Sequence, residues 1–273
     1  MQARYATLEL ERTDDWLTVW LNRPGSRNAL DSAMTAELRA VFDAVAVDAA
    51  IRGVTLRGRG GVFCAGGDLK AFRAMAVDDA ASLDTAIAHN LEAGRLFEAI
   101  NTLPQVVVVL VEGAAMAGGL GMACCADVVA VTRDAQFALT ETTLGIPPAQ
   151  IAPIVAARLG LATARRLMLT AARFGGDEAR TLGLADFVAA DVTELQRIET
   201  ELRAQVRRCA PGANAATKAI LLASRTLQGD ALRQFAAESF ARALMGAEGR
   251  EGLQAFLDKR PPRWAATPDE AQS

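Results

Sequence analysis

Residues 106–122 read VVVVLVEGAAMAGGLGM, and this stretch decides the fold. The β-branched run from Val106 to Val111 indicates a buried strand, and Glu112-Gly113 marks the turn that ends it. A helix is expected to begin near Gly118 and to run towards Cys125. The start of a helix leaves backbone N–H groups without partners and carries positive dipole charge, and glycines let a ligand approach the backbone closely. The stretch therefore predicts a junction that holds an anion, or an oxygen that becomes an anion during a reaction.

Two common phosphate-binding motifs do not fit this junction. The spacing from Gly113 to Gly118 matches a phosphate loop, but Gly119-Leu120 follows where Lys-Ser/Thr is required. The segment Gly119-Leu120-Gly121 lacks the third glycine of a dinucleotide-binding motif. A junction whose glycines serve only tight packing stays open as an alternative at this point.

Composition limits the class of protein. The chain has 273 residues, of which 51% are hydrophobic, so a large core can be buried. A net charge of −3 argues against a nucleic-acid partner, which usually requires a basic face. The N-terminal residues form no apolar signal segment, and no apolar run is long enough to span a bilayer. We therefore expect a cytoplasmic protein without a membrane or nucleic-acid partner.

The cysteines and the single histidine suggest no metal site. Cys64, Cys124, Cys125 and Cys209 show no CxxC spacing, which favours small buried hydrophobic side chains in a reducing compartment. One histidine, His89, excludes a histidine-rich site. It falls off the apolar stripe of its own expected helix, so we expect it at the surface.

Hydrophobic periodicity divides the chain into a core of alternating strands and helices, residues 1–190, and a helical region, residues 191–273. Strands are expected at 8–11, 17–21, 54–57, 106–111, 128–132, 136–139 and 184–188. Helices are expected at 32–47, 69–75, 118–125, 151–159, 162–169, 177–182, 193–208, 213–227, 229–245 and 248–258. A further long helix is expected to start at Asp78 or Asp79 and to end before Pro104, with an apolar stripe at Leu83, Ile87, Leu91, Gly94, Phe97 and Ile100.

Three segments in order resemble one family. They are Asn22-Arg23-Pro24 with Asn28-Ala29-Leu30, then Phe63-Cys64-Ala65-Gly66-Gly67-Asp68-Leu69, then Gly113 to Gly121 with Ala126-Asp127 and Gln136-Phe137 to Gly145. Each motif alone is weak, but all of them in this order resemble the crotonase, or enoyl-CoA hydratase/isomerase, family over nearly the whole chain.

The resemblance implies an α/β fold, a spiral of ββα units with a C-terminal helical region that forms trimers. A homotrimer or a dimer of trimers is therefore expected. In such an assembly, Ile220, Leu221, Phe235, Phe240 and Leu244 would be partly buried against other subunits. The resemblance also implies acyl-CoA thioester substrates, an enolate-like intermediate, and no separate cofactor, because coenzyme A is part of the substrate.

By position in the family, the backbone N–H groups of Gly67 and Gly118 form the oxyanion hole. The residues that the resemblance assigns to CoA or substrate binding are Arg27, Ala29, Ala65, Gly66, Asp68, Leu69, Met116, Gly119 and Lys259. Lys259 could reach the nucleotide from a neighbouring subunit.

The catalytic carboxylates depart from the two-glutamate pattern. The first glutamate position is Gly121 in this chain, whereas the second matches Glu141. A single carboxylate can activate water for addition at the β-carbon, or carry a proton between the α- and γ-carbons as an isomerase does. If space allows, Gly121→Glu is expected to raise activity on simple enoyl thioesters.

The segment from Phe137 to Pro153 resembles the branch that hydrates methylglutaconyl-CoA and isohexenylglutaconyl-CoA. We therefore expect a hydratase for a branched 3-substituted glutaconyl-CoA in leucine or acyclic-terpene catabolism. A Δ3,Δ2-enoyl-CoA isomerase and a non-catalytic acyl-CoA-binding protein remain alternatives. Lys70, Arg73 and Arg95 are candidate partners for a second substrate carboxylate.

Overall fold

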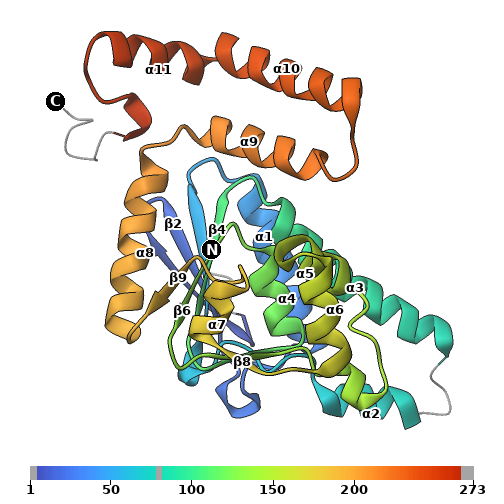
Figure 1. Cartoon of the computed structure of the whole chain (residues 1–273). Coiled ribbons are helices and arrows are strands. Elements are labelled where there is room, and N and C mark those ends of the chain that lie inside the picture. The colour runs from blue at the N-terminus through green and yellow to red at the C-terminus, as the bar shows by residue number, and fades with distance from the viewer. Residues whose placement is uncertain (1–4, 78–81, 266–273) are drawn as a thin grey trace.

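Figure 1 shows the fold in a computed structural model of the chain, which describes residues 5–77 and 82–265. Its main sheet has six strands in the order β1-β2-β3-β4-β6-β9, with β1 antiparallel to β2 and the other pairs parallel. These strands are β1 (Leu8–Thr13), β2 (Trp16–Leu21), β3 (Gly53–Gly58), β4 (Val106–Val111), β6 (Val128–Thr132) and β9 (Phe187–Ala189).

A second, small sheet carries the segments that follow β4. It orders β5 (Ala114–Met116), β7 (Gln136–Ala138) and β8 (Phe174–Gly175). Sequence reasoning missed β5 and β8, because runs of two or three residues, one of them rich in alanine, are too short to show a strand period.

The helices follow the expected ranges closely. They are α1 (Ser32–Ala46), α2 (Leu69–Val77), α3 (Leu83–Thr102), α4 (Gly118–Cys125), α5 (Ala152–Leu159), α6 (Leu161–Thr170), α7 (Gly176–Thr181), α8 (Val192–Arg207), α9 (Pro211–Ala223), α10 (Gly229–Met245) and α11 (Ala247–Leu257). Four short 3-10 helices are η1 (Pro24–Ser26), η2 (Arg59–Gly61), η3 (Glu141–Leu144) and η4 (Arg263–Ala265).

The start of α3 differs from the expectation. Ser82 caps the helix, because its hydroxyl accepts a hydrogen bond from the N–H of Thr85 at 3.1 Å. The expected starts at Asp78 or Asp79 lie outside the described residues.

The apolar stripe of α3 is buried only in its C-terminal half. Leu96, Phe97 and Ile100 are buried in the core, whereas the side chains of Leu83, Ile87 and Leu91 are exposed. The expected stripe is therefore wrong at its first three members, because the N-terminal turns of α3 extend beyond the sheet that would cover them.

The two faces of the main sheet bury two separate cores. On one face the strands pack against α1, α3 and α4 in the larger cluster, which includes the expected stripe of α1 from Met34 to Val45. On the other face a smaller cluster joins Trp16, Val108 and Ala130 to Leu195 and Ile198 of α8. Figure 1 shows α8 alone on that side of the sheet and the other helices of the core across from it.

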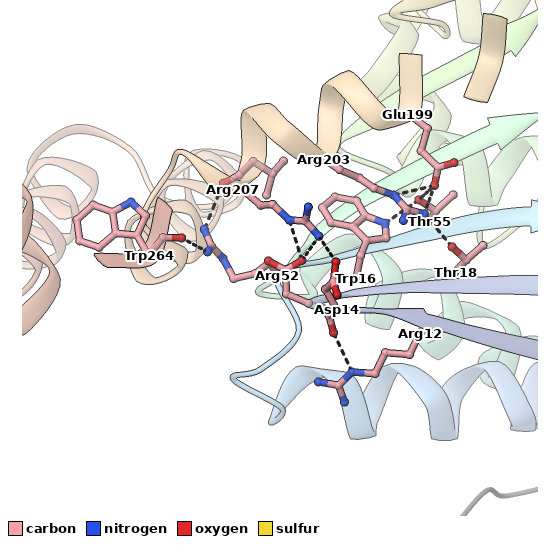
Figure 2. A network of polar contacts seen from close by, with 12 residues as sticks. Arg12, Asp14, Trp16, Thr18, Arg52, Thr55, Glu199, Arg203, Arg207 and Trp264 are labelled. Carbon is pink, nitrogen blue, oxygen red and sulfur yellow. Dashed lines mark hydrogen bonds and ion pairs between the residues drawn. The ribbon is translucent and has the colours of Figure 1, made fainter. Parts of the chain in front are cut away.

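A polar network fixes α8 to the sheet (Figure 2). The hydroxyl of buried Thr55 accepts from the indole N–H of Trp16 at 2.8 Å and donates to Glu199 of α8 at 2.6 Å. Arg203 pairs with Glu199 and also donates to Thr18 of β2 at 3.0 Å. Every polar group named is partnered, so the network orients α8 without leaving a buried charge unpaired.

The last helices extend away from this core. Figure 1 shows α10 and α11 beyond α9, at the end of the molecule remote from α2. On α9–α11, large apolar side chains are exposed, among them Leu221 at 65%, Phe240 at 66% and Phe256 at 82%. None of the described helices is long and apolar enough to cross a membrane.

Candidate active site

Two short backbone pairings bring the glycine-rich segments together. Residues 64 and 115 form a parallel bridge in which Cys64 accepts from the N–H of Met116 at 2.9 Å. Residues 30 and 67 form a second bridge, with Leu30 donating to Gly66 at 2.8 Å. The loop that carries Gly67 is therefore held next to the start of α4.

A strained alanine turns the chain from β5 into α4. Ala117 has φ 48° and ψ −118°, and its N–H donates to Ala138 at 2.8 Å. A positive φ is uncommon for a residue with a Cβ, and such strain is concentrated at functional sites. The turn leaves the next residue, Gly118, as the first residue of the helix.

The N–H groups of Gly67 and Gly118 are both available to a ligand. Among the described residues neither donates to a protein acceptor, and the Gly118 group stands at the positive end of the α4 dipole. Both glycines line the same cavity. Two fixed donors in one cavity suit an oxygen that becomes negative during a reaction.

Close packing leaves little space for a side chain at the glycines of these segments. A Cβ on Gly119 would lie 2.6 Å from the carbonyl oxygen of Cys64, and Gly66 has a φ of +95°. A Cβ on Gly67 would lie 2.7 Å from the ring of Phe72. Larger residues at these positions would push apart the segments that hold the two donors.

Glu141 supplies a carboxylate to the same cavity. It begins η3, where its backbone carbonyl accepts from the N–H groups of Gly145 and Ile146. Its Oε2 atom is buried and has no hydrogen-bond partner among the described residues. Burial raises the pKa of this carboxyl above its usual value, and the hydrogen bond from its own backbone N–H opposes that shift only in part.

The cavity has a volume of about 550 Å³, within the usual range for a small-molecule site. Its walls come from α1, α2, α3, the residues around Gly67 and Gly118, and the segment from Thr140 to Ile151. The part of the chain that the structure describes contains no group of three or more metal-binding side chains.

The residues predicted from the sequence fall into two groups. Glu141, Gly67, Gly118, Ala65 and Leu69 line the cavity. The other predicted residues lie outside its lining: Arg27, Ala29, Gly66, Asp68, Met116, Gly119 and Lys259.

Several of these other residues have clear structural roles. Asp68 accepts from the N–H of Lys70 at the start of α2 and pairs with Arg23 at 3.4 Å. Arg27 is exposed and adopts a φ of 52° after η1, with its carbonyl accepting from the N–H of Ala65. Lys259 lies two residues after the end of α11, which Figure 1 shows at the end of the molecule remote from α2.

Gly121 is buried under the segment that follows Glu141. A Cβ at this position would lie 2.3 Å from Cγ2 of Ile151 and 3.5 Å from the ring of Phe97. The space that a first catalytic glutamate would need is therefore filled by Ile151.

Sequence reasoning missed several polar residues of the cavity. His89, Asn90 and Gln150 all line it. The expectation that His89 lies at the surface is wrong: it is half-buried, and its ring meets Phe72 edge to face at 5.9 Å and 87°. The apolar stripe alone could not reveal this, because the open face of α3 forms a wall of the cavity.

The charged lining also differs from the expectation. Lys70, Arg73 and Arg95 do not line the cavity, whereas Arg39 of α1 does. Its Nε is buried without a partner among the described residues, and its Nη2 pairs with Asp43 at 3.6 Å.

Comparisons with known proteins show one family and several proteins that the chain resembles over nearly its whole length. Residues 12–267 match the family described as Enoyl-CoA hydratase/isomerase. The solved structure of Pseudomonas aeruginosa AtuE is 52% identical, with a TM-score of 0.92, over 95% of this chain and all of that one. An enoyl-CoA hydratase/isomerase of Marinobacter aquaeolei is 41% identical, with a TM-score of 0.91, over 95% of this chain and 99% of that one. A Rhodobacter capsulatus protein named "Probable enoyl-CoA hydratase" is 33% identical over 95% of this chain and 98% of its own length. The expected α/β spiral fold is confirmed by these matches.

Proposed function

The chain belongs to the enoyl-CoA hydratase/isomerase family, and from this membership we propose that it hydrates a branched 3-substituted glutaconyl-CoA. At the general level the protein is a lyase of the enoyl-CoA hydratase type that acts on acyl-CoA thioesters. The finer proposal names isohexenylglutaconyl-CoA or 3-methylglutaconyl-CoA as substrate, in acyclic-terpene or leucine breakdown.

One observation carries the mechanism. Glu141 lines the same cavity as Gly67 and Gly118, and within residues 5–77 and 82–265 neither its buried Oε2 nor the N–H groups of the two glycines have a hydrogen-bond partner. A buried acceptor without a partner is costly, so such an atom is expected where a ligand supplies the missing hydrogen bond. Water is the ligand that hydration requires.

Each group then has one role in the addition. The Glu141 carboxylate accepts a proton from water while the water oxygen bonds to the β-carbon, and the double-bond electrons move towards the thioester oxygen. The Gly67 and Gly118 N–H groups donate to that oxygen in the enolate. Glu141 then returns the proton to the α-carbon, so that one water molecule adds across the double bond. Removing one such donor costs about 3–4 kcal/mol in known hydrolytic sites.

The branched substrate is supported by the Phe137 to Pro153 segment and by the cavity. The lining includes residues of the segment from Leu144 to Ile151, which follows Glu141, and the polar side chains of Asn90 and Gln150. A site for a simple aliphatic chain alone would not need these amides.

The runner-up is a Δ3,Δ2-enoyl-CoA isomerase, and Gly121 is the observation that favours it. With Ile151 in the place of a second carboxylate, Glu141 must act alone, or with a water or another residue. A non-catalytic acyl-CoA-binding protein is the third candidate, in which Glu141 would have no chemical role.

The proposed enzyme is cytoplasmic and works as a homotrimer or a dimer of trimers, and coenzyme A enters only as part of the substrate. The exposed apolar side chains of α9–α11 support an assembly that covers them. Arg27 and a neighbouring subunit's Lys259 are proposed to meet the CoA phosphates. The position of α11, which ends two residues before Lys259 and lies remote from α2, supports a contribution across subunits.

The test is turnover of a panel of thioesters: crotonyl-CoA, a 3-enoyl-CoA, 3-methylglutaconyl-CoA and isohexenylglutaconyl-CoA. Hydration removes the ultraviolet absorbance of the conjugated enoyl thioester, whereas isomerisation of the 3-enoyl ester creates it. The proposal expects loss of absorbance with the glutaconyl esters. Gain of absorbance with the 3-enoyl ester and no loss with the others would favour the isomerase.

A further inference from the structure

A pair of amide side chains links the segment after Glu141 to helix α3. Nε2 of Gln150 donates to Oδ1 of Asn90 at 2.7 Å, and both residues line the cavity. This leaves Nδ2 of Asn90 without an acceptor among the described residues. The pair therefore offers N–H donors to a ligand in the cavity.

A glycine in α3 sets the position of the pair. A Cβ on Gly94 would lie only 2.3 Å from Oε1 of Gln150. Glycine inside a helix is unfavourable relative to alanine, so its presence indicates a packing requirement. Here the missing side chain provides the space in which Gln150 lies against α3.

Contacts along α3 relate the amide pair to the reacting centre. Phe97 lies 3.8 Å from the position of a Cβ on Gly118 and 3.5 Å from that on Gly121. Gly94 lies three residues before Phe97, and Asn90 lies seven residues before it, on the same helix face. Since the rise is about 1.5 Å per residue, Asn90 stands about two turns from Phe97 along the axis of α3, and the ring of Phe97 lies beside Gly118.

This separation matches a substrate with polar groups at both ends of a short acyl chain. A glutaconyl group carries its thioester carbonyl and its second carboxylate at the two ends of five carbons. With the thioester oxygen at Gly67 and Gly118, an acyl chain that runs along α3 would bring the second carboxylate to Asn90 and Gln150.

We propose that Asn90 and Gln150 bind the second carboxylate of a dicarboxylic enoyl thioester, which sets the specificity of the enzyme for such substrates. The inference rests on the proposed function. Hydrogen bonds to a charged acceptor are stronger than neutral ones. Arg39 is the cation of the same lining, and its Nη2 pairs with Asp43 on α1 at 3.6 Å. It is the competing partner for the carboxylate, so the test below includes its variant.

Binding of two saturated thioesters tests the proposal without turnover. Glutaryl-CoA carries the second carboxylate, whereas pentanoyl-CoA has the same chain length and lacks it, and neither can be hydrated. For the wild type, calorimetry should give a Kd for glutaryl-CoA about 10- to 100-fold lower than for pentanoyl-CoA.

Three variants should bring this ratio below about threefold, since each removes or displaces one amide. They are Asn90→Leu, Gln150→Leu and Gly94→Ala, the last of which displaces Gln150 without deleting a polar group. Asn101→Leu on the same helix is the matched control, because Asn101 does not line the cavity; it should keep the wild-type ratio.

Two outcomes would overturn the inference: a wild-type ratio near one, or amide variants that keep the ratio while Arg39→Gln abolishes it. Hydration of crotonyl-CoA and 3-methylglutaconyl-CoA is measured in parallel on the wild type. If the wild type hydrates the enoyl thioesters but the amide variants keep the wild-type ratio of the two Kd values, only the carboxylate site is refuted. If the wild type hydrates no enoyl thioester, the proposed function itself is refuted.

Discussion

Replacing Glu141 with glutamine keeps the shape of the side chain but removes its basic oxygen. In the wild type Oε2 is buried and has no hydrogen-bond partner among the described residues, and Ile151 fills the space that a carboxylate at position 121 would need. Loss of general acid–base catalysis lowers rates by about 10²–10⁴. At 1.36 kcal/mol for each tenfold change, this corresponds to about 2.7–5.5 kcal/mol of lost transition-state stabilisation.

Steady-state hydration, followed by loss of the enoyl-thioester absorbance, measures this effect. We expect kcat to fall by the factor above in Glu141→Gln, while the Kd for a saturated acyl-CoA stays near the wild-type value. A Glu141→Gln enzyme with full hydratase activity would refute the assignment of the base.

The pH profile adds an independent check on the same group. Because burial raises the pKa of Glu141 above 4.5, the base is protonated over a wider acid range. The rate kcat/KM should therefore rise with pH through a pKa above 4.5 and then level off. An acid limb at or below 4.5 would contradict the buried environment.

The raised pKa also has a consequence for stability. The folded state holds the Glu141 proton to higher pH than the unfolded state does, so the free energy of unfolding falls as pH rises between the usual and the raised pKa. Glutamine does not titrate, so Glu141→Gln does not lose this part of the free energy of unfolding as pH rises. Its melting temperature should therefore exceed that of the wild type at neutral pH but not at pH values below the usual pKa. If the two proteins had equal melting temperatures at both pH values, the raised pKa of Glu141 in the folded state would be contradicted.

The remaining predictions concern space, coenzyme A and assembly. Gly121→Glu should lower the free energy of unfolding by about 1–3 kcal/mol, the usual cost of overpacking, and should not raise crotonyl-CoA turnover, because Ile151 occupies the space; a stable and more active variant would contradict this. Neutralising Arg27 and Lys259 together should raise KM for CoA esters and leave kcat nearly unchanged, as loss of uniform binding does; a fall in kcat at constant KM would refute their roles. Light scattering should show a trimer or a hexamer at micromolar concentration, and a monomer would refute the assembly.

The sequence predicted most of the main sheet and its helices, since these elements have long and clear periods. The strand 106–111, the helix 118–125 and the strand 128–132 occur at the expected residues. The small sheet was missed because β5 and β8 are pieces of two or three residues, held by partners far along the chain rather than by their own pattern.

The sequence predicted the cavity residues that belong to recognisable motifs, and it missed those that are brought together only by packing. The residues Gly67, Gly118 and Glu141 lie in recognisable segments, and the structure brings them to one cavity. The amides of Asn90 and Gln150 belong to no such segment. The two amides form their hydrogen bond because Gln150, in a loop more than 50 residues further along the chain, lies against Gly94. No local sequence pattern reveals a contact of this kind.

The central claim is that the enzyme adds water to a glutaconyl thioester, and isotope incorporation tests it most directly. The wild type is incubated with 3-methylglutaconyl-CoA in water enriched in oxygen-18, and the product is analysed by mass spectrometry. The account predicts a 3-hydroxyacyl-CoA that carries one heavy oxygen on its β-carbon. A product with a shifted double bond and no heavy oxygen, or unchanged substrate at full enzyme integrity, would contradict it.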